Sequence, residues 1–455
     1  MKNTTNPAEA FATESIPKLV IKNCIPSLLA MMMMLVYNLA DTFFIGMTHD
    51  DLQVAAVSLA SPMFMIFVAV GTLFAIGSSS LISIALGAKK SEYAKKISAF
   101  CFWGCIAVAA VMTAAILIFA KDIVIMLGAS ENTIENTKNY LMITASGGIC
   151  TMLSVSFTNM IRAEGKPLIS SIGMIAGNIL NIILDPILIL GCGWGVTGAA
   201  IATVIGNLAG TLFYLVYFCL GKSSLSIRIC DFSLKKEIVT GVFSIGISSS
   251  ITNFLVSISS MLVNSMLSQY PDGDMYVAGY GVTMKIVMIV SLIAVGIGTG
   301  AQPLFGYCYG AKNKERMVAC IRFATFFGLA FCFTSALLCF IFAKPIVGIF
   351  LTGDVACASG MHYIRIIMST AWLMGGFLVF QSSLQAMGAA LPALLTSTLR
   401  QGIVFIPLLF AMRSVLGAEG LLWAQPIADL ISFAIVLFIL IRKIRHLNFD
   451  AIPKS

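Results

Sequence analysis

The chain has 455 residues, of which 59% are hydrophobic and only 11% are charged, and its formal net charge is +8. Soluble domains carry about 25% charged residues, so this composition excludes an ordinary soluble enzyme, and its apolar content excludes a disordered chain. A mean hydropathy of +0.97 indicates an integral membrane protein with many spans.

Twelve apolar runs are each long enough to cross a bilayer, which takes about 20 residues of helix. They are expected at residues 20–46, 54–86, 97–119, 139–161, 168–190, 196–220, 239–268, 277–309, 320–342, 361–386, 391–412 and 420–441. The segment before the first run is polar and carries Glu9 and Glu14, so we do not expect a cleaved signal peptide. The predicted fold is an all-α integral membrane protein with twelve transmembrane helices.

The basic residues are concentrated in alternate loops. If the N-terminus is cytoplasmic, most of the 28 Lys and Arg residues lie on the cytoplasmic side, in segments such as 89–96, 222–236 and 312–322. Cytoplasmic loops of membrane proteins carry such an excess of Lys and Arg. Both termini are therefore predicted to be cytoplasmic, in the plasma or inner membrane. The net positive charge then reflects topology, and we expect no nucleic-acid partner.

The sequence repeats itself after 223 positions. In this ungapped frame the turn Gly87–Lys89 matches Gly310–Lys312, and Glu92 matches Glu315. Because six spans return the chain to its starting face, the two halves should have the same orientation and be related by an axis along the membrane normal.

The repeat divides the chain into two pseudo-symmetric six-helix bundles. The expected parts are an N-terminal tail at 1–19, an N-lobe at 20–220, a linker at 221–238, a C-lobe at 239–441 and a C-terminal tail at 442–455. Doubled bundles are typical of alternating-access transporters. We therefore expect a cavity between the lobes and polar groups inside them that bind the transported species.

Charged residues inside the predicted spans are the first candidates for function. A charge at the centre of a membrane helix costs about 2.5–3.5 kcal/mol, so each is expected to have a partner or a role. Five charged residues lie well inside the predicted spans, away from their ends: Asp41, Asp185, Lys285, Arg400 and Asp429. For the last three, a structural pair between helices remains an equal or stronger interpretation than a functional site.

Two of these carboxylates are predicted to lie at one depth in the N-lobe. Asp41 and Asp185 both fall about 9 Å below the outer ends of their helices, and Thr203 falls about 10 Å below the outer end of the next helix. Asn181 lies one turn from Asp185 on the same face, and Pro186 is expected to kink this helix. Carboxylate, amide and hydroxyl oxygens suit a small hard cation, and paired carboxylates also suit a proton.

Three segments resemble the multidrug and toxic compound extrusion (MATE) family. They are YNLADTFFIG at Tyr37–Gly46, IRAEGKP at Ile161–Pro167 and NIILDP at Asn181–Pro186. The resemblance extends over nearly the whole chain. It implies a twelve-helix, two-lobe exporter that exchanges inward Na⁺ or H⁺ for outward organic compounds. It also implies a cation site formed by Asp41, Asn181, Asp185 and Thr203, which match the family pattern in type and spacing.

The second lobe departs from one branch of the family. Members of that branch carry a glutamate on helix 7 and an aspartate on helix 10, whereas these spans here have no carboxylate and carry polar residues such as Asn253 and Gln385. Asn264 occupies the position that matches Asp41 in the repeat, so the ion site is not expected to be duplicated. Possible polar residues of the cavity are Lys285, Asn264, Gln381, Arg400 and Asp429.

We therefore expect a secondary antiporter that acts as a monomer, with drugs or organic cations and membrane lipid as its partners. No GxxxxGK[ST] motif occurs, so no ATP-driven pumping is expected, and no cofactor is expected beyond the coupling ion. One alternative is a lipid-intermediate flippase of the same superfamily, which should have a more cationic cavity. The alternatives of another class are a membrane enzyme or a receptor, and an enzyme would need a nucleophile or metal ligands at membrane depth.

Overall fold

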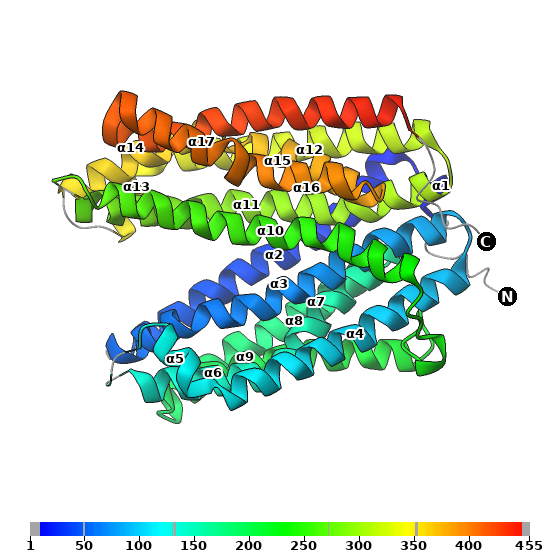
Figure 1. Ribbon diagram of the computed structural model, residues 1–455, viewed down its shortest axis with the longest axis horizontal. Helices are drawn as coiled ribbons and strands as arrows, with labels where there is room; N and C mark the ends of the chain where they lie inside the picture. Colours follow the sequence, from blue (N-terminus) through cyan, green and yellow to red (C-terminus); the bar gives the residue numbers. More distant parts are fainter. Residues whose placement is uncertain are drawn as a thin grey trace. The chain divides into compact units, whose positions relative to one another are not determined.

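The protein is described by a computed structural model, which covers residues 10–48, 51–129, 131, 133–271, 273–350 and 354–447. These residues form α-helices and short 3-10 or π-helical turns, and none of them forms a strand (Figure 1). The expected terminal tails are described only from residue 10 and up to residue 447. The all-α class predicted from composition is confirmed.

The chain divides into two compact units, and the first is built around Leu29–Gly246. Its elements are most of α2 (Ile16–Gly46), α3 (Asp51–Gly87), α4 (Ser91–Ile118), α5 (Ala120–Met126), α6 (Ile134–Ser146), α7 (Gly148–Ala163), α8 (Pro167–Asp185), η2 (Pro186–Gly191), α9 (Gly195–Cys219), η3 (Ile229–Asp231) and the start of α10 (Lys236–Leu267). Its long helices run side by side in Figure 1, with the pairs α3–α7 and α8–α9 in close contact.

The second unit contains Phe11–Leu28 and the chain from Ile247 onward. Its elements are α1 (Ala10–Thr13) from its second residue, the start of α2, most of α10, α11 (Gly273–Gly310), α12 (Lys314–Ile341), α13 (Ala343–Phe350), α14 (Asp354–Ala371), α15 (Leu373–Ala386), α16 (Ala390–Thr398), η4 (Leu399–Ile403) and α17 (Phe405–Arg445). Within this unit α11 packs on both α12 and α15.

The helices account for twelve membrane spans. Among the described residues, nine helical stretches are long and apolar enough to cross a bilayer, and two bent pairs supply one span each. The ninth stretch, Ala390–Arg445, has 56 residues, or about 84 Å of helix, far more than one crossing needs. Gly417 breaks it with a non-helical backbone at φ 62°, which leaves a span on each side. The predicted twelve-helix fold is confirmed.

The two bent spans are the fourth and the tenth. The pair α6–α7 bends by 47° at Gly147, and the pair α14–α15 bends by 45° at Trp372. Both bends fall at the same place in the 223-residue repeat to within two positions, so the bend belongs to the repeated architecture. The predicted spans 139–161 and 361–386 thus each correspond to two helices that meet at a bend.

The structure repeats at the turns that the sequence frame matches. Lys89 and Lys312 are the two non-glycine residues with positive φ among the described residues, at 59° and 57°. After each, the next backbone N–H donates five residues back, from Lys90 to Ala85 and from Asn313 to Cys308. This is a C-terminal helix cap whose capping residue has a left-handed backbone conformation, and it ends both α3 and α11.

Two helix ends belong to the opposite unit from the rest of their helix. The first residues of α2, up to Leu28, belong to the second unit, and α10 belongs to the first unit up to Gly246. The predicted lobes at 20–220 and 239–441 therefore differ from the two units at these helix ends. The predicted linker at 221–238 belongs to the first unit. Pro26, whose ring removes one helical hydrogen bond, lies two residues before the change in α2.

Candidate functional site

Glycines bring α8 and α9 unusually close in the first unit. A Cβ atom at Gly177 would lie 2.6 Å from the backbone oxygen of Gly206, and a Cβ atom at Gly206 would lie 2.7 Å from the oxygen of Gly177. Any larger residue at either position would push the helices apart. Asn181 and Asp185 continue the buried face of Gly177 at four-residue spacing, so the close packing directs both side chains toward α9.

Immediately after Asp185 the helix widens into a π-helical turn at Pro186–Gly191. Pro186 has no N–H, so the carbonyl of Ile182 loses its normal helical donor. The turn then closes with longer-range bonds, in which Cys192 N–H donates to Ile187 O at 2.8 Å. The kink expected at Pro186 is thus present as a π-helical turn, a feature that is frequent at functional sites.

The three residues from α8 and α9 form one buried cluster. Asp185 is 0% exposed, Asn181 is 3% exposed and Thr203 is 6% exposed. With the Asn181 amide oriented to suit its neighbours, its nitrogen donates to Asp185 Oδ2 at 3.1 Å and its oxygen accepts from the Thr203 backbone N–H at 3.0 Å. In the opposite orientation the amide nitrogen would donate to Thr203 Oγ1 at 3.5 Å, one long hydrogen bond in place of two shorter ones.

Residues of α2 complete the cluster. Asp41 lies near enough to Asp185 for the two carboxylates to interact electrostatically. Tyr37, one turn before Asp41 on the same helix face, places its hydroxyl against Thr203. The four residues selected from the sequence are therefore together in the structure, drawn from three helices.

Two tyrosines of this cluster were not selected from the sequence. Tyr37 and Tyr140 both lie near enough to Asp41 and Asp185 for electrostatic interaction with the two carboxylates. Tyr140 is a buried residue of α6. The i, i+4 spacing of Tyr37 and Asp41 could have revealed the first. Nothing in the sequence distinguishes Tyr140, because α6 reaches the cluster only through tertiary packing.

Each carboxylate of the cluster keeps one unsatisfied oxygen. Oδ1 of Asp41 and Oδ1 of Asp185 are buried and have no hydrogen-bond partner among the described residues. A buried acceptor without a donor costs about 1–3 kcal/mol, and more when it is charged. Two such oxygens beside amide and hydroxyl groups form a set of hard ligands that a small cation or a proton would satisfy.

The second unit holds a different polar arrangement. Arg400 Nε donates to Asp429 Oδ1 at 2.8 Å, and Gln425 Nε2 donates to the same oxygen at 2.8 Å. The Arg400 guanidinium also lies 6.0 Å from the ring centre of Phe377. The ion pair joins η4 to α17 and lines a cavity of about 100 Å³ within this unit.

The repeat frame gives this pair an informative counterpart. Arg400 and Asp429 occupy the positions that match Gly177 and Gly206, the two glycines in contact in the first unit. Where the first unit closes two helices on each other, the second unit places two charged side chains between them. The structural interpretation left open for Arg400 and Asp429 thus has a defined geometry.

The other polar residues of the second unit do not join one site. Gln381, 5% exposed on α15, donates to Ser397 Oγ at 2.8 Å, and Gln385 donates to two serines of α10. Asn264 is exposed on α10, where it lines an open groove. Lys285 is exposed on α11. Of the five residues proposed for a polar cavity, Arg400 and Asp429 are in direct contact with each other.

Comparison with known proteins gives one family over most of the chain. The MatE family model matches residues 26–187 and 248–411. The multidrug export protein MepA of Staphylococcus aureus (strain MRSA252) is 32% identical over 420 residues, which cover 92% of each chain. MepA of Staphylococcus haemolyticus is 30% identical over 445 residues and covers 97% of this chain and 96% of its own.

Solved structures show the same fold. An outward-facing multidrug resistance MATE family transporter matches with a TM-score of 0.92 at 22% identity, covering 98% of this chain and 99% of its own. A superfamily transporter from Pyrococcus furiosus, described as having a binding pocket of reversed polarity, matches with a TM-score of 0.89 at 22% identity. It covers 98% of this chain and 100% of its own, and at such identities the likeness extends to the fold alone.

Proposed function

The chain belongs to the multidrug and toxic compound extrusion (MATE) family of transporters, and on that premise we propose that it is a secondary antiporter. It exports amphipathic, mostly cationic compounds in exchange for inward Na⁺ or H⁺. The coupling site consists of Asp41, Asn181, Asp185 and Thr203. As a member of a transporter family, the chain is not an enzyme.

The observation that carries the proposal is the pair of buried carboxylates with one unsatisfied oxygen each. Two carboxylates that interact in a poorly solvated place do not both remain charged comfortably. A bound Na⁺ neutralises them through oxygen ligands, or a proton bound to one of them removes half of the charge. Either ion lowers the free energy of the conformer in which α2, α8 and α9 stand close together.

Coupling follows from that preference. In an antiporter the ion and the exported compound favour different conformers, so each lowers the affinity for the other, and by linkage the two effects are equal. Asp41 and the start of α2 belong to one continuous helix that contains Pro26. We therefore propose that α2 bends near Pro26 or Gly46 as the site fills, and that this bend alters the binding of the exported compound.

The function is tested with inside-out vesicles that contain the full chain. Fluorescent cationic dyes and fluoroquinolone-like drugs are expected to move against their gradient when a Na⁺ gradient or a pH gradient is imposed alone. The gradient that drives transport identifies the coupling ion. If neither gradient drives any compound of a broad panel in vesicles with confirmed expression, the antiporter proposal is wrong and the flippase alternative gains support.

We also propose that both termini are cytoplasmic, in the plasma or inner membrane. The basic segments 89–96, 222–236 and 312–322 support this orientation. In a cysteine-free background, a Thr48→Cys variant should react with a membrane-impermeant maleimide in intact cells, and a Lys235→Cys variant should react only after the cells are opened. Labelling of both variants from one side would contradict the twelve-span topology.

A further inference from the structure

One face of α12 carries an arginine on the surface of a membrane-spanning helix. Arg322 is exposed and lies about 12 Å from the start of α12 at Lys314. It makes no ion pair or hydrogen bond with any residue that the structure describes. An unpaired guanidinium facing hydrocarbon is expensive, so a partner outside the protein is expected.

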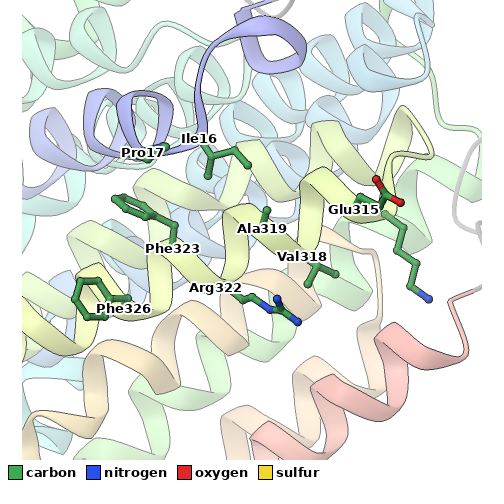
Figure 2. A pocket seen from close by; sticks show the side chains of 9 residues that line it. Ile16, Pro17, Glu315, Val318, Ala319, Arg322, Phe323 and Phe326 are labelled. Carbon is green, nitrogen blue, oxygen red and sulfur yellow. The ribbon is translucent and has the colours of Figure 1, made fainter.

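The surroundings of Arg322 form a groove that we call the α12 groove. Its volume is about 720 Å³. It is lined by Ile16, Pro17, Lys314, Glu315, Val318, Ala319, Arg322, Phe323 and Phe326. Figure 2 shows Phe323 on the side of Pro17, Phe326 one turn farther along, and the Arg322 side chain extending outward. Two cations against the single carboxylate of Glu315 leave the groove net positive, above an apolar floor.

The first unit shows what the same face does when the chain covers it. In the repeat frame α12 matches α4, and Arg322 matches the fully buried Ala99. There the segment 226–232 lies on α4: Ser98 Oγ donates to Ser226 O at 2.7 Å and Trp103 Nε1 donates to Ile227 O at 3.2 Å.

The second unit lacks the side chains that hold such a cover. Ser98 and Trp103 correspond to Ile321 and Phe326, neither of which can donate a hydrogen bond. Phe326 is 70% exposed. The α12 face around Arg322 is thus suited to an apolar occupant with a negatively charged end. The segment Phe11–Glu14, which does lie on this helix, is held nearer the helix start by Arg316.

A second groove of the same unit repeats the pattern. It has a volume of about 480 Å³ and contains Phe438, Arg442 and Lys443 near the end of α17. Phe438 is 64% exposed and lies one turn before Arg442, just as Phe326 lies one turn from Arg322. In both cases the arginine is nearer the helix end and the phenylalanine is deeper in the span.

We propose that the α12 groove binds an anionic phospholipid, whose phosphate is held by Arg322 with Lys314 and whose acyl chain lies along Phe323 and Phe326. A hydrocarbon core of about 30 Å leaves about 6 Å of the 28-residue α12 at each end in the headgroup region. Arg322 therefore starts about 6 Å inside the core, a depth from which its long side chain reaches the phosphate level. Guanidinium binds phosphate through two parallel hydrogen bonds. A zwitterionic headgroup can also accept these bonds, but only an anionic headgroup adds a net electrostatic attraction to the two cations.

The test is lipid binding to the purified full-length chain by native mass spectrometry. Phosphatidylglycerol should bind more tightly than phosphatidylcholine with the same acyl chains. Arg322→Gln should lower the affinity for the first phosphatidylglycerol about fivefold, and Arg322→Lys should retain most of it. Arg442→Gln should weaken a second bound lipid in the same way. The exposed Arg228→Gln, in the segment that covers α4, is the matched control and should change nothing.

Four results would overturn the proposal. Equal binding of the two lipids excludes recognition of charge, and an unchanged affinity in Arg322→Gln excludes this groove. Loss of the bound lipid in an excess of inorganic phosphate indicates a free-phosphate site. Tighter lipid binding after truncation beyond Leu447 indicates that the C-terminal tail covers the groove instead. Gel filtration and thermal unfolding of Arg322→Gln, expected to match those of the unaltered chain, separate a binding defect from misfolding.

Discussion

Asp41→Asn should lower ion-driven efflux by about 5- to 150-fold, the range that corresponds to typical coupling free energies. The asparagine keeps the size of the side chain but removes the charge that pairs with the cation or takes up the proton. Asp185→Asn should have the same effect, because its buried carboxylate supplies the other unsatisfied oxygen. The initial rate of dye efflux under the driving gradient measures both.

The controls separate coupling from folding. Asp122→Asn removes an exposed carboxylate of α5 in the same unit and should leave efflux unchanged. Thr203→Ala removes a neutral ligand and should weaken the apparent ion affinity only about fivefold. Full gradient-driven efflux by both aspartate variants, at normal expression, would show that the coupling site lies elsewhere.

The convergence of the first-unit cluster follows from quantities that the sequence contains. Helix rise places Asp41, Asp185 and Thr203 at one depth, and the four-residue spacing puts Asn181 on the face of Asp185. Depth alone does not select which faces meet. That step depends on the contact between Gly177 and Gly206, which turns α8 and α9 toward each other.

Other features require tertiary information. Tyr140 reaches the cluster because the α6–α7 span bends at Gly147, and no local pattern predicts a bend of 47°. The expected spans at 391–412 and 420–441 are separated in the structure by a single non-helical glycine, Gly417, and not by a loop. The uncovered face around Arg322 is likewise invisible in the sequence, where this residue lies at the junction of the basic segment 312–322 and the predicted span 320–342.

The pairing of Arg400 with Asp429 shows how the repeat transfers information between the units. Neither residue identifies the other in the sequence, since 29 positions separate them. The frame matches them to Gly177 and Gly206, however, so a contact known in one unit predicts which positions face each other in the second. The matching positions hold two glycines in close approach in one unit and an ion pair in the other.

Removing one member of this pair should destabilise the protein by about 3–5 kcal/mol, because it leaves the other charge buried without its partner. The side chains of Arg400 and Asp429 are 15% and 3% exposed. Asp429→Leu and Arg400→Met each leave one buried charge without its partner, whereas the double variant leaves none. The free energy of unfolding of the double variant should therefore lie within about 1 kcal/mol of that of the unaltered chain. Denaturant unfolding in detergent, followed by circular dichroism, gives the three free energies.

Efflux by the double variant then distinguishes a structural pair from a functional one. If the pair only fills the space that Gly177 and Gly206 close in the first unit, the folded double variant should export dye at the normal rate. A double variant as unstable as the single variants would mean that the 100 Å³ cavity cannot accept apolar side chains. A stable double variant without efflux would instead place Arg400 and Asp429 in the transport cycle, since stability and transport would then respond to different properties of the same two residues.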